Sequence, residues 1–463
     1  MSTRRTGQGI VRSNGPNILL IMSDQHRADW LGCAGANWVK TPNIDDLAER
    51  GVRFRMAACD SPVCAPSRSA LASGQRCSAI GVLSNRDLYP LDVPTYYQAL
   101  RASGYRVGCV GKTDLHKIDH WEGIQGDRPI MYHLGFTDPM ETEGKQSAGR
   151  YAMQGVCPYT HYLVQNGLDK AFFDDYERRR PVWSSGDSVL PLHAYHDDFV
   201  GRNACRFLET VSAETPWHYF VSFVGPHNPW DAPKEYSSRY RPEDMPAERA
   251  IQDPMQDKPE IYRTRHDEHS RDLTRERLAA AMLHYSGMVT LIDDYVGRFA
   301  AILKERGLWE NTVIIYSSDH GEMMGDHGMF AKSTYFEQAL RIPLLIAGPG
   351  IRPRGSVDAL VQLSDLAPTI LELADLGCPG DMQSRSLVPI LRGKADTARE
   401  FQVSELADSR MLFDGRYKFV EHDNDKDELY DLEEDPRELR NLAGHTRTRS
   451  LEMKNRLHQL LKE

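Results

Sequence analysis

Short, uninterrupted apolar runs constrain this chain of 463 residues more than any other feature of its sequence. The first run, residues 17–22, shows no polar alternation, which is typical of a strand that is buried on both faces of a parallel sheet. The other runs of this kind are residues 106–110, 218–224, 312–317 and 344–347. Helical stretches such as residues 278–306 and 364–376 alternate with them. This alternation predicts an α/β fold with a large, mostly parallel sheet flanked by helices.

The pattern changes after about residue 380. Short alternating runs at residues 401–404, 410–413, 417–421 and 428–432 are followed by a polar helical stretch near residues 447–461. The chain also exceeds the roughly 250–300 residues at which a single core usually stops growing. We therefore predict an α/β domain over residues 1–380 and a smaller subdomain, an antiparallel sheet with a helix, over residues 381–463.

Two polar segments, residues 117–215 and 231–277, lack sustained periodicity and are long for loops. Segments of this kind commonly form lids, substrate walls or oligomer arms, so they leave a homo-oligomer open. The side chains in them that could line a substrate site are Tyr159, Trp183, His196, Asp197 and Trp230. Aromatic residues in such segments serve packing more often than recognition, and the sequence does not choose among these five.

Charge and hydropathy exclude two classes of partner. The 66 acidic and 56 basic residues are spread along the whole chain and give a formal net charge of −10. Without a concentrated basic face, the chain has no surface suited to nucleic-acid phosphates. No run approaches the roughly 18 apolar residues that a membrane span needs. We expect neither nucleic acid nor membrane as a partner.

The N-terminus and the cysteines indicate the compartment. Residues 1–16 contain three arginines but no apolar region of the kind found in a secretory signal. The eight cysteines include no C-x-x-C pair, in a chain too long to need disulfides. We expect a cytoplasmic enzyme whose cysteines are mostly buried, inert thiols.

Polar residues follow four of the predicted strands directly. Asp24-Gln25 follows the first run, Lys112 the second, His227 the third, and Asp319-His320 the fourth. In open α/β sheets, ligands bind beyond the carboxyl ends of the strands. Together these groups could hold one divalent cation and an anionic substrate. A lone strand-terminal aspartate more often caps a helix, so the prediction depends on their coincidence.

The run Cys64-Ala-Pro-Ser-Arg68, placed where a helix is predicted to begin at Pro66 and end at Gly74, resembles the signature of the type I sulfatases. Asp24-Gln25, Gly111-Lys112 and residues 318–321 resemble further motifs of that family, as do residues 348–350 and 428–432. The resemblance covers nearly the whole chain. It implies an alkaline phosphatase-like fold and a cysteine, Cys64, that is converted to formylglycine by a generating enzyme.

The resemblance also implies the roles of individual residues. The metal ligands would be Asp24, Gln25, Asp319, His320 and the modified Cys64. Oxygen ligands favour calcium, whereas the imidazole makes manganese credible and magnesium stays open. The groups around the sulfate would be Arg68, Lys112, Lys332, the polar contact Asn85, and His227 as the acid that protonates the leaving oxygen.

One position departs from the family pattern. Where relatives commonly read Gly-Lys-x-His, this chain has Asp114, and His116 follows two residues later. A carboxylate facing a sulfate would repel it unless it were protonated or paired. Asp114 could therefore bind a polyhydroxylated or cationic leaving group, bond to Arg68 or Lys112, or point away while His116 replaces the missing histidine.

The chemistry of a sulfate monoester fits such a site, because its anionic oxygens shield the sulfur from attack. Catalysis needs charge neutralisation, an oxygen nucleophile and protonation of the leaving group. A hydrated formylglycine at position 64 would supply a geminal diol, whose two hydroxyls attack sulfur and later expel sulfate. The leading prediction is a sulfatase acting on a small organic sulfate. Two alternatives are a phosphonate monoester hydrolase or phosphodiesterase of the same family, and an inactive binding protein on this scaffold.

Overall fold

The computed structural model describes residues 15–117, 123–179, 184–250 and 252–462. Its main sheet has eight strands in the order β4-β3-β5-β1-β6-β7-β2-β8, and only β7 runs antiparallel to its neighbours. The strands are β1 Asn17–Ser23, β2 Val52–Ala58, β3 Arg106–Gly111, β4 Asp138–Glu141, β5 Trp217–Ser222, β6 Thr312–Ser318, β7 Leu344–Ala347 and β8 Gly355–Gln362. The predicted α/β class and mostly parallel sheet are confirmed.

The apolar runs of the sequence did not predict the strands β2, β4 and β8. β2 carries Arg53 and Arg55 among its apolar residues, and β8 lies at the edge of the sheet with its first residues exposed. β4 has four residues, at the opposite edge. Edge strands do not need two apolar faces, so they carry no uninterrupted apolar run.

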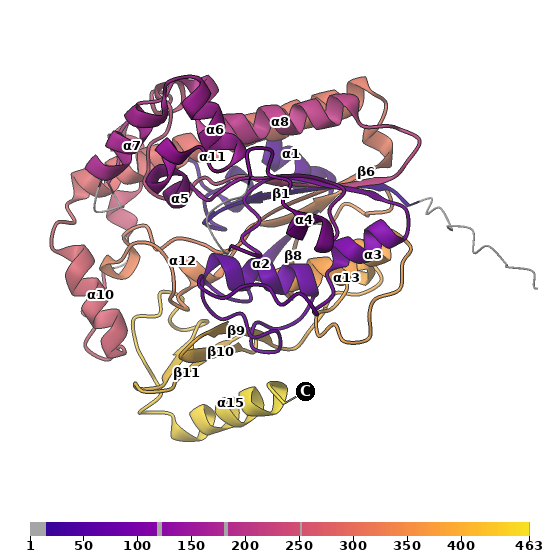
Figure 1. The fold of residues 1–463 in the computed structure, drawn as a ribbon. Coiled ribbons are helices and arrows are strands. Elements are labelled where there is room, and N and C mark those ends of the chain that lie inside the picture. The colour runs from indigo at the N-terminus through magenta and orange to yellow at the C-terminus, as the bar shows by residue number, and fades with distance from the viewer. Residues whose placement is uncertain (1–14, 118–122, 180–183, 251, 463) are drawn as a thin grey trace, which may run out of the picture.

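Side chains of β1 alternate between two apolar layers, one on each face of the sheet. Ile18 and Leu20 belong to a layer that includes residues of α2, α3 and α13, whereas Leu19 and Ile21 join a layer with α1, α8 and α11 (Figure 1). The bounds of these helices are α1 Pro42–Arg50, α2 Cys64–Ser73, α3 Tyr96–Ala102, α8 His196–Thr210, α11 Arg275–Glu305 and α13 Leu366–Leu373. This two-layer burial explains the unbroken apolar character of β1.

The two polar segments fold mostly into short helices. The α-helices of these segments, besides α8, are α4 Pro129–His133, α5 Lys145–Arg150, α6 Pro158–Gln165, α7 Asp169–Arg178, α9 Lys234–Ser237 and α10 Glu260–Ser270. The 3₁₀ helices of the described chain are η1 Gly32–Ala34, η2 Ala152–Gln154, η3 Leu192–Ala194, η4 Pro242–Asp244, η5 Ala247–Arg249, η6 Trp309–Asn311, η7 Asp326–Gly328 and η8 Leu363–Asp365. Two further short α-helices are α12 Glu337–Leu340 and α14 Val388–Leu391. Helices this short make too few turns to show a periodic pattern.

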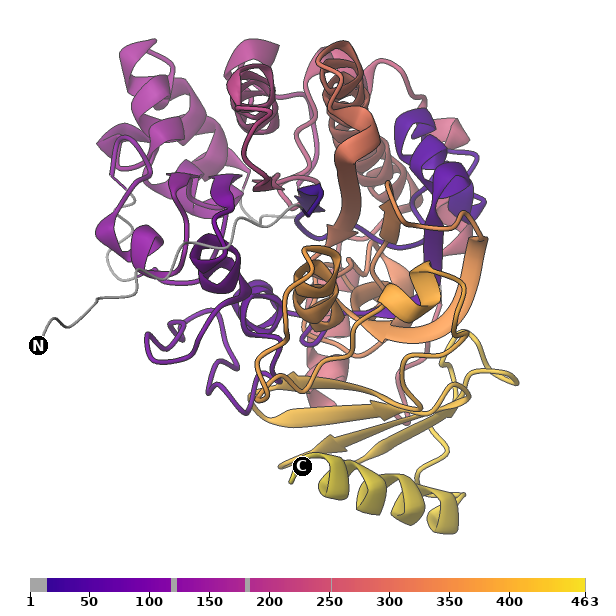
Figure 2. The ribbon, with the colours of Figure 1, turned by 90° about the vertical axis from the view of Figure 1, so that its right-hand side faces the viewer.

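The C-terminal part forms a separate four-stranded antiparallel sheet, as predicted. Its strands, in the order β12-β11-β10-β9, are β9 Gln402–Leu406, β10 Ser409–Phe413, β11 Tyr417–His422 and β12 Glu428–Asp431. Leu412 and Phe419 pack on the final helix, α15 Arg447–Leu460. Met411 and Phe413 face the core of the main sheet, so the small sheet is held between that core and α15 (Figure 2).

None of the helices that the structure describes is both long enough and apolar enough to cross a membrane. The prediction about a secretory signal concerns residues 1–16, of which residues 1–14 lie outside the described part of the chain.

Candidate active site

The register of two neighbouring strands brings the first ligand candidates together. β1 and β6 are parallel, and Ser23 lies opposite Ser318. Asp24 and Asp319 each follow directly at the carboxyl ends of these strands and are completely buried. Side chains that are some 295 residues apart in the sequence thus become neighbours because two parallel strands end at the same level. The structure thus brings these two strand-end aspartates together.

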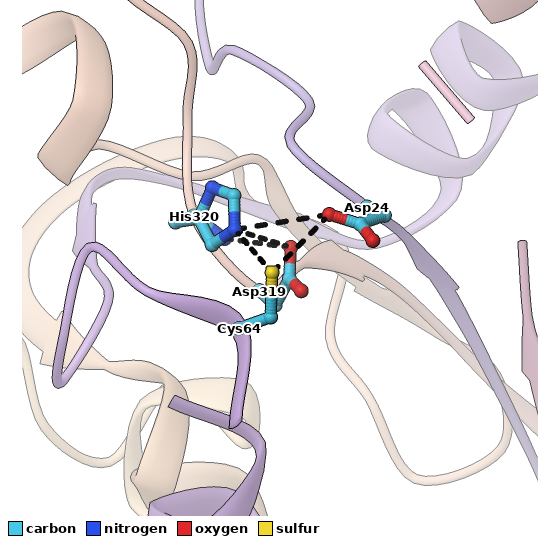
Figure 3. A group of neighbouring side chains, drawn as sticks. All are labelled: Asp24, Cys64, Asp319 and His320. Carbon is cyan, nitrogen blue, oxygen red and sulfur yellow. Dashed lines mark hydrogen bonds and ion pairs between the residues drawn. The ribbon is translucent and has the colours of Figure 1, made fainter. Parts of the chain in front are cut away.

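Cys64 enters the same site as the first residue of α2, two residues before the predicted start of this helix at Pro66. The predicted end is confirmed, because α2 stops at Ser73 and Gly74 follows in the left-handed conformation. One ligand atom each of Asp24, Cys64, Asp319 and His320 lies within 4.8 Å of the others (Figure 3). Cys64 Sγ is 3.2 Å from His320 Nε2 and 3.8 Å from Asp24 Oδ1.

His320 presents its ring nitrogen to this cluster in a defined way. Nδ1 lies 2.9 Å from the carbonyl oxygen of Gly321, so Nδ1 carries the hydrogen and donates it. In the neutral ring, Nε2 then keeps its lone pair on the side of Cys64, as metal-ligating histidines do.

Gln25 adds an oxygen without a partner. Its Nε2 donates to Asn228 Oδ1 at 3.1 Å and to the carboxylate of Glu322. Its Oε1 is buried and has no hydrogen-bond partner among the described residues. Such an atom is costly unless something binds it, and a metal ion beside Asp24 and Asp319 would do so. The donor set of two carboxylates, an amide oxygen and an imidazole therefore fits a divalent cation.

Three cations balance the buried carboxylates and the thiol. Arg68 Nε donates to Asp319 Oδ2 at 2.8 Å, Lys112 Nζ donates to Asp24 Oδ2 at 2.6 Å, and Lys332 Nζ lies 2.9 Å from Cys64 Sγ. Burial opposes ionisation of both aspartates, but Lys112 holds the pKa of Asp24 well below its usual range and Arg68 lowers the pKa of Asp319. Both groups are thus ready to bind a cation.

The pKa of the Cys64 thiol is also lowered. Burial and Asp24 raise its pKa, yet the positive charges of Lys112, Lys332 and His320 outweigh them and lower the pKa to about 7. The other buried cysteines, such as Cys59 and Cys77, have pKa values raised by burial. Cys64 is therefore the cysteine with a polar, chemically distinct environment.

Asp114 takes one of the roles left open by the sequence. Its Oδ2 lies 3.1 Å from Lys112 Nζ, and its Oδ1 lies 2.9 Å from Lys117 Nζ. Burial would raise its pKa, but these two lysines hold the pKa below its usual value. Asp114 therefore pairs with Lys112. His116 lies outside the cluster: its carbonyl accepts a hydrogen bond from Arg128, and its Nδ1 has no hydrogen-bond partner among the described residues.

His227 and Asn85 line the cleft that leads to the cluster. The Nδ1 hydrogen of His227 is donated to the carbonyl of Asn228 at 2.7 Å. Burial, then the charge of Lys332, lower the pKa of His227 to about 3, so the ring is neutral in the free enzyme. Asn85 Oδ1 accepts the backbone N–H of Ala65 at 3.0 Å and so fixes the first turn of α2.

The cleft has a volume of about 320 Å³. Its lining residues are Asn85, Gln146, His227, Asn228, Trp230, Arg265, His269, Phe330, Ala331, Lys332 and Ser333. Of the five wall candidates only Trp230 lines it. The rings of Tyr159 and His196 stack with their centroids 3.7 Å apart. Asp197 accepts hydrogen bonds from the backbone N–H groups of residues 224 and 225. Trp183 lies outside the described residues.

Sequence reasoning missed Gln146, Arg265 and His269, which come from α5 and α10. These helices are short and polar, and no local signal distinguishes a residue that points into a cleft from one that points into solvent. Glu322 was also missed, although it stands two residues after His320 in a run that already resembled a metal motif.

Comparison with known proteins agrees with this geometry. The sulfatase family model matches residues 16–376, and the model for the C-terminal part of N-sulphoglucosamine sulphohydrolase matches residues 325–463. An arylsulfatase of Clostridium perfringens is 29% identical over 467 residues, covering 96% of this chain and 93% of that protein. A choline-sulfatase of Rhizobium meliloti is 28% identical over 454 residues, covering 93% and 83%.

A crystal structure of the phosphonate monoester hydrolase of Agrobacterium radiobacter is similar throughout. It superposes with a TM-score of 0.79 at 25% identity and covers 96% of this chain and 95% of that one. The family model alone matches more than half of the chain, over the whole segment that carries the cluster. The chain belongs to the sulfatase family of hydrolases.

Proposed function

We propose that this enzyme hydrolyses an organic sulfate monoester, with a formylglycine made from Cys64 as nucleophile and one divalent metal ion. The observation that carries the proposal is the buried cluster of Asp24, Cys64, Asp319 and His320, whose ligand atoms lie within 4.8 Å of one another. Cys64 stands at the N-terminus of α2, where the helix dipole favours a negative oxygen.

The metal would be held by Asp24, Gln25, Asp319 and His320 beside residue 64. When bound, it supplies charge neutralisation for the nucleophile and for the sulfate oxygens. The set is dominated by oxygen ligands, which supports calcium, while His320 keeps manganese and magnesium open.

The cations of the chain have separate tasks. Arg68 keeps Asp319 ionised and aligned, and its buried Nη2 has no hydrogen-bond partner among the described residues, so it can donate to an anionic oxygen. Lys332 lies against residue 64, where it can neutralise the nucleophile or a sulfate oxygen. Lys112 forms ion pairs with both Asp24 and Asp114 and so offsets part of the negative charge of these two carboxylates.

His227 would protonate the leaving oxygen. Its Nδ1 hydrogen is committed to the carbonyl of Asn228, so Nε2 is the nitrogen that can exchange a proton in the cleft. Burial and the neighbouring lysine keep its pKa low in the free enzyme. An anionic sulfate placed beside the ring would stabilise the protonated form and raise that pKa.

The alternative is a phosphonate monoester hydrolase or a phosphodiesterase. The Asp24-Gln25 and Asp319-His320 pairs and the similarity to the Agrobacterium enzyme favour it. An inactive binding protein is the weaker alternative, because every expected ligand position is filled.

Maturation and location complete the proposal. A cysteine at position 64 requires a formylglycine-generating enzyme as partner. We infer a cytoplasmic location from the eight cysteines, none of which forms a disulfide bond in the described chain.

Mass spectrometry of the peptide that contains Cys64 tests the proposal, on protein produced together with a generating enzyme. We expect the mass of formylglycine, and a kcat/KM for an aryl sulfate that exceeds the value for the matching aryl phosphonate. A reversed preference would establish the alternative. Unmodified cysteine in such protein would refute the nucleophile.

A further inference from the structure

The charge of the cleft is of one sign. Among the described residues that line it, Arg265 and Lys332 are cationic and none is an aspartate or a glutamate. This contrasts with the chain as a whole, whose formal net charge is −10. Lys332 contacts Cys64 Sγ and belongs to the reacting centre, whereas Arg265 has no part in the chemistry proposed above.

Arg265 is fixed beside the reacting centre by its own contacts. It belongs to α10, and its Nη1 donates to the carbonyl oxygens of Lys332 at 2.6 Å and Ser333 at 3.2 Å. These bonds place the guanidinium next to the segment that carries Lys332.

In the described part of the chain, Arg265 has no direct ion-pair partner. Its carboxylate neighbours Glu268 and Asp408 lie beyond ion-pair distance, and its Nε and Nη2 make no hydrogen bond to described residues. Burial lowers the pKa of Arg265, and the charges of Tyr262, Glu268 and Asp408 oppose this shift only in part. A half-buried guanidinium remains charged, so it offers a planar pair of donors to an anion that enters the cleft.

The rest of the cleft suits a ring. Trp230 and Phe330 form an apolar wall with their ring centroids 5.4 Å apart, and Gln146 adds an amide. No carboxylate is available to bind a cationic leaving group, because Asp114 is already paired with Lys112 and Lys117.

We propose that Arg265 forms an anion subsite, so that the substrate is a sulfate ester with a second anionic group on or beside its ring. A carboxylate or a second sulfate would meet the same guanidinium. The sulfate esters of sugar acids and multiply sulfated sugars have this chemistry, whereas a choline-like ester does not. The inference rests on the proposed sulfatase function.

Two isosteric probes test the subsite. The carboxyphenyl sulfates, with the carboxylate at position 3 or 4, are compared with the corresponding carbamoylphenyl sulfates, which are neutral at that position. We expect kcat/KM of the mature enzyme to be about tenfold or more higher for the better of the two carboxylates, as hydrogen bonds to a charged group allow. Carboxylates cleaved no faster than carboxamides would overturn the proposal.

Variants assign the preference to a residue. Arg265→Met should remove the preference for the carboxylate while retaining most of the activity on the carboxamide, and Arg265→Lys should keep part of it. Arg263→Ala, which removes an exposed arginine from the same helix, should leave the preference intact. Equal losses on both probes in Arg265→Met would show that the arginine only supports the segment of Lys332, which would refute the subsite.

A failure of the proposed function gives a different result. If enzyme with converted Cys64 and bound metal cleaves neither class of sulfate, the sulfatase assignment is wrong. Calorimetric binding of the same probes to the Cys64→Ala variant then still decides the subsite: tighter binding of the carboxylate that Arg265→Met abolishes supports it, and equal binding overturns it.

Discussion

Exchanging Gln25 and Glu322 tests the metal site through the orientation of a single amide. The carboxylate of Glu322 accepts the backbone N–H groups of Met324 at 2.9 Å and Ala331 at 2.6 Å through Oε1, and the amide of Gln25 through Oε2. The hydrogen bonds to Glu322 and Asn228 hold the NH₂ group of Gln25 away from the cluster. The Oε1 atom of Gln25 is therefore free to bind a metal ion.

In Glu322→Gln the oxygen of the new amide can still accept the two backbone N–H groups. Its NH₂ then meets the NH₂ of Gln25, and two donors face each other in a buried place. The loss of a hydrogen bond to a charged group costs about 1.5–3 kcal/mol. Since residues that orient a ligand affect metal binding, we expect the metal affinity to fall about 10–100-fold.

Gln25→Glu should be unfavourable for the opposite reason, because it places a carboxylate against that of Glu322. The double variant Gln25→Glu/Glu322→Gln restores a donor opposite an acceptor and keeps the total charge. Its stability should therefore exceed the sum of the single effects by about 1.5–3 kcal/mol. Urea unfolding of the metal-free protein gives these free energies, and competition with a chelator gives the metal affinity.

Additive effects, within about 0.5 kcal/mol, would refute the direction assigned to the amide. An unchanged metal affinity in Glu322→Gln would show that Gln25 is not a ligand. Gln338→Glu provides a control, since the backbone carbonyl of Gln338 accepts the N–H of Glu322 but its side-chain Oε1 makes no hydrogen bond to described residues.

Further expectations concern turnover. Cys64→Ala and Asp319→Ala should each abolish activity, measured as release of inorganic sulfate, and appreciable residual turnover in Cys64→Ala would contradict the nucleophile. His227→Ala should slow esters of poor leaving groups most and nitrophenyl sulfate least, since a good leaving group needs no proton; equal losses across a series of leaving groups would exclude the acid role. Removal of the metal with a chelator should abolish activity and lower Tm, and calcium or manganese should restore both; full activity after verified metal removal would contradict a metal site.

Much of the site could be predicted because it lies at strand ends. Asp24 and Asp319 follow uninterrupted apolar runs, and in a parallel sheet such positions converge without any knowledge of the loops. Cys64 and Arg68 carry a local motif. The α/β class and the C-terminal antiparallel sheet depend on periodicities that are also local, and the structure confirms both.

The rest depends on contacts between distant segments. Arg265 reaches the cleft because α10 packs beside residues 332–333, and nothing in the polar sequence of α10 distinguishes it from Arg263. The free oxygen of Gln25 follows from the positions of Asn228 and Glu322, which come from two different loops. The sequence leaves several roles open for Asp114, and only the positions of Lys112 and Lys117 beside it select the pairing.

The aspartate at position 114 also explains how the charges of this site are divided. Asp24, Lys112, Asp114 and Lys117 form a line of alternating charges, with contacts of 2.6, 3.1 and 2.9 Å. Lys112 thus shares its charge between two carboxylates and has less of it to offer to a substrate than a lysine with a neutral histidine beside it. In the proposed mechanism, neutralisation of the sulfate therefore falls to the metal, Arg68 and Lys332, and the positive charge that remains for the leaving group is that of Arg265, beside the segment of Lys332.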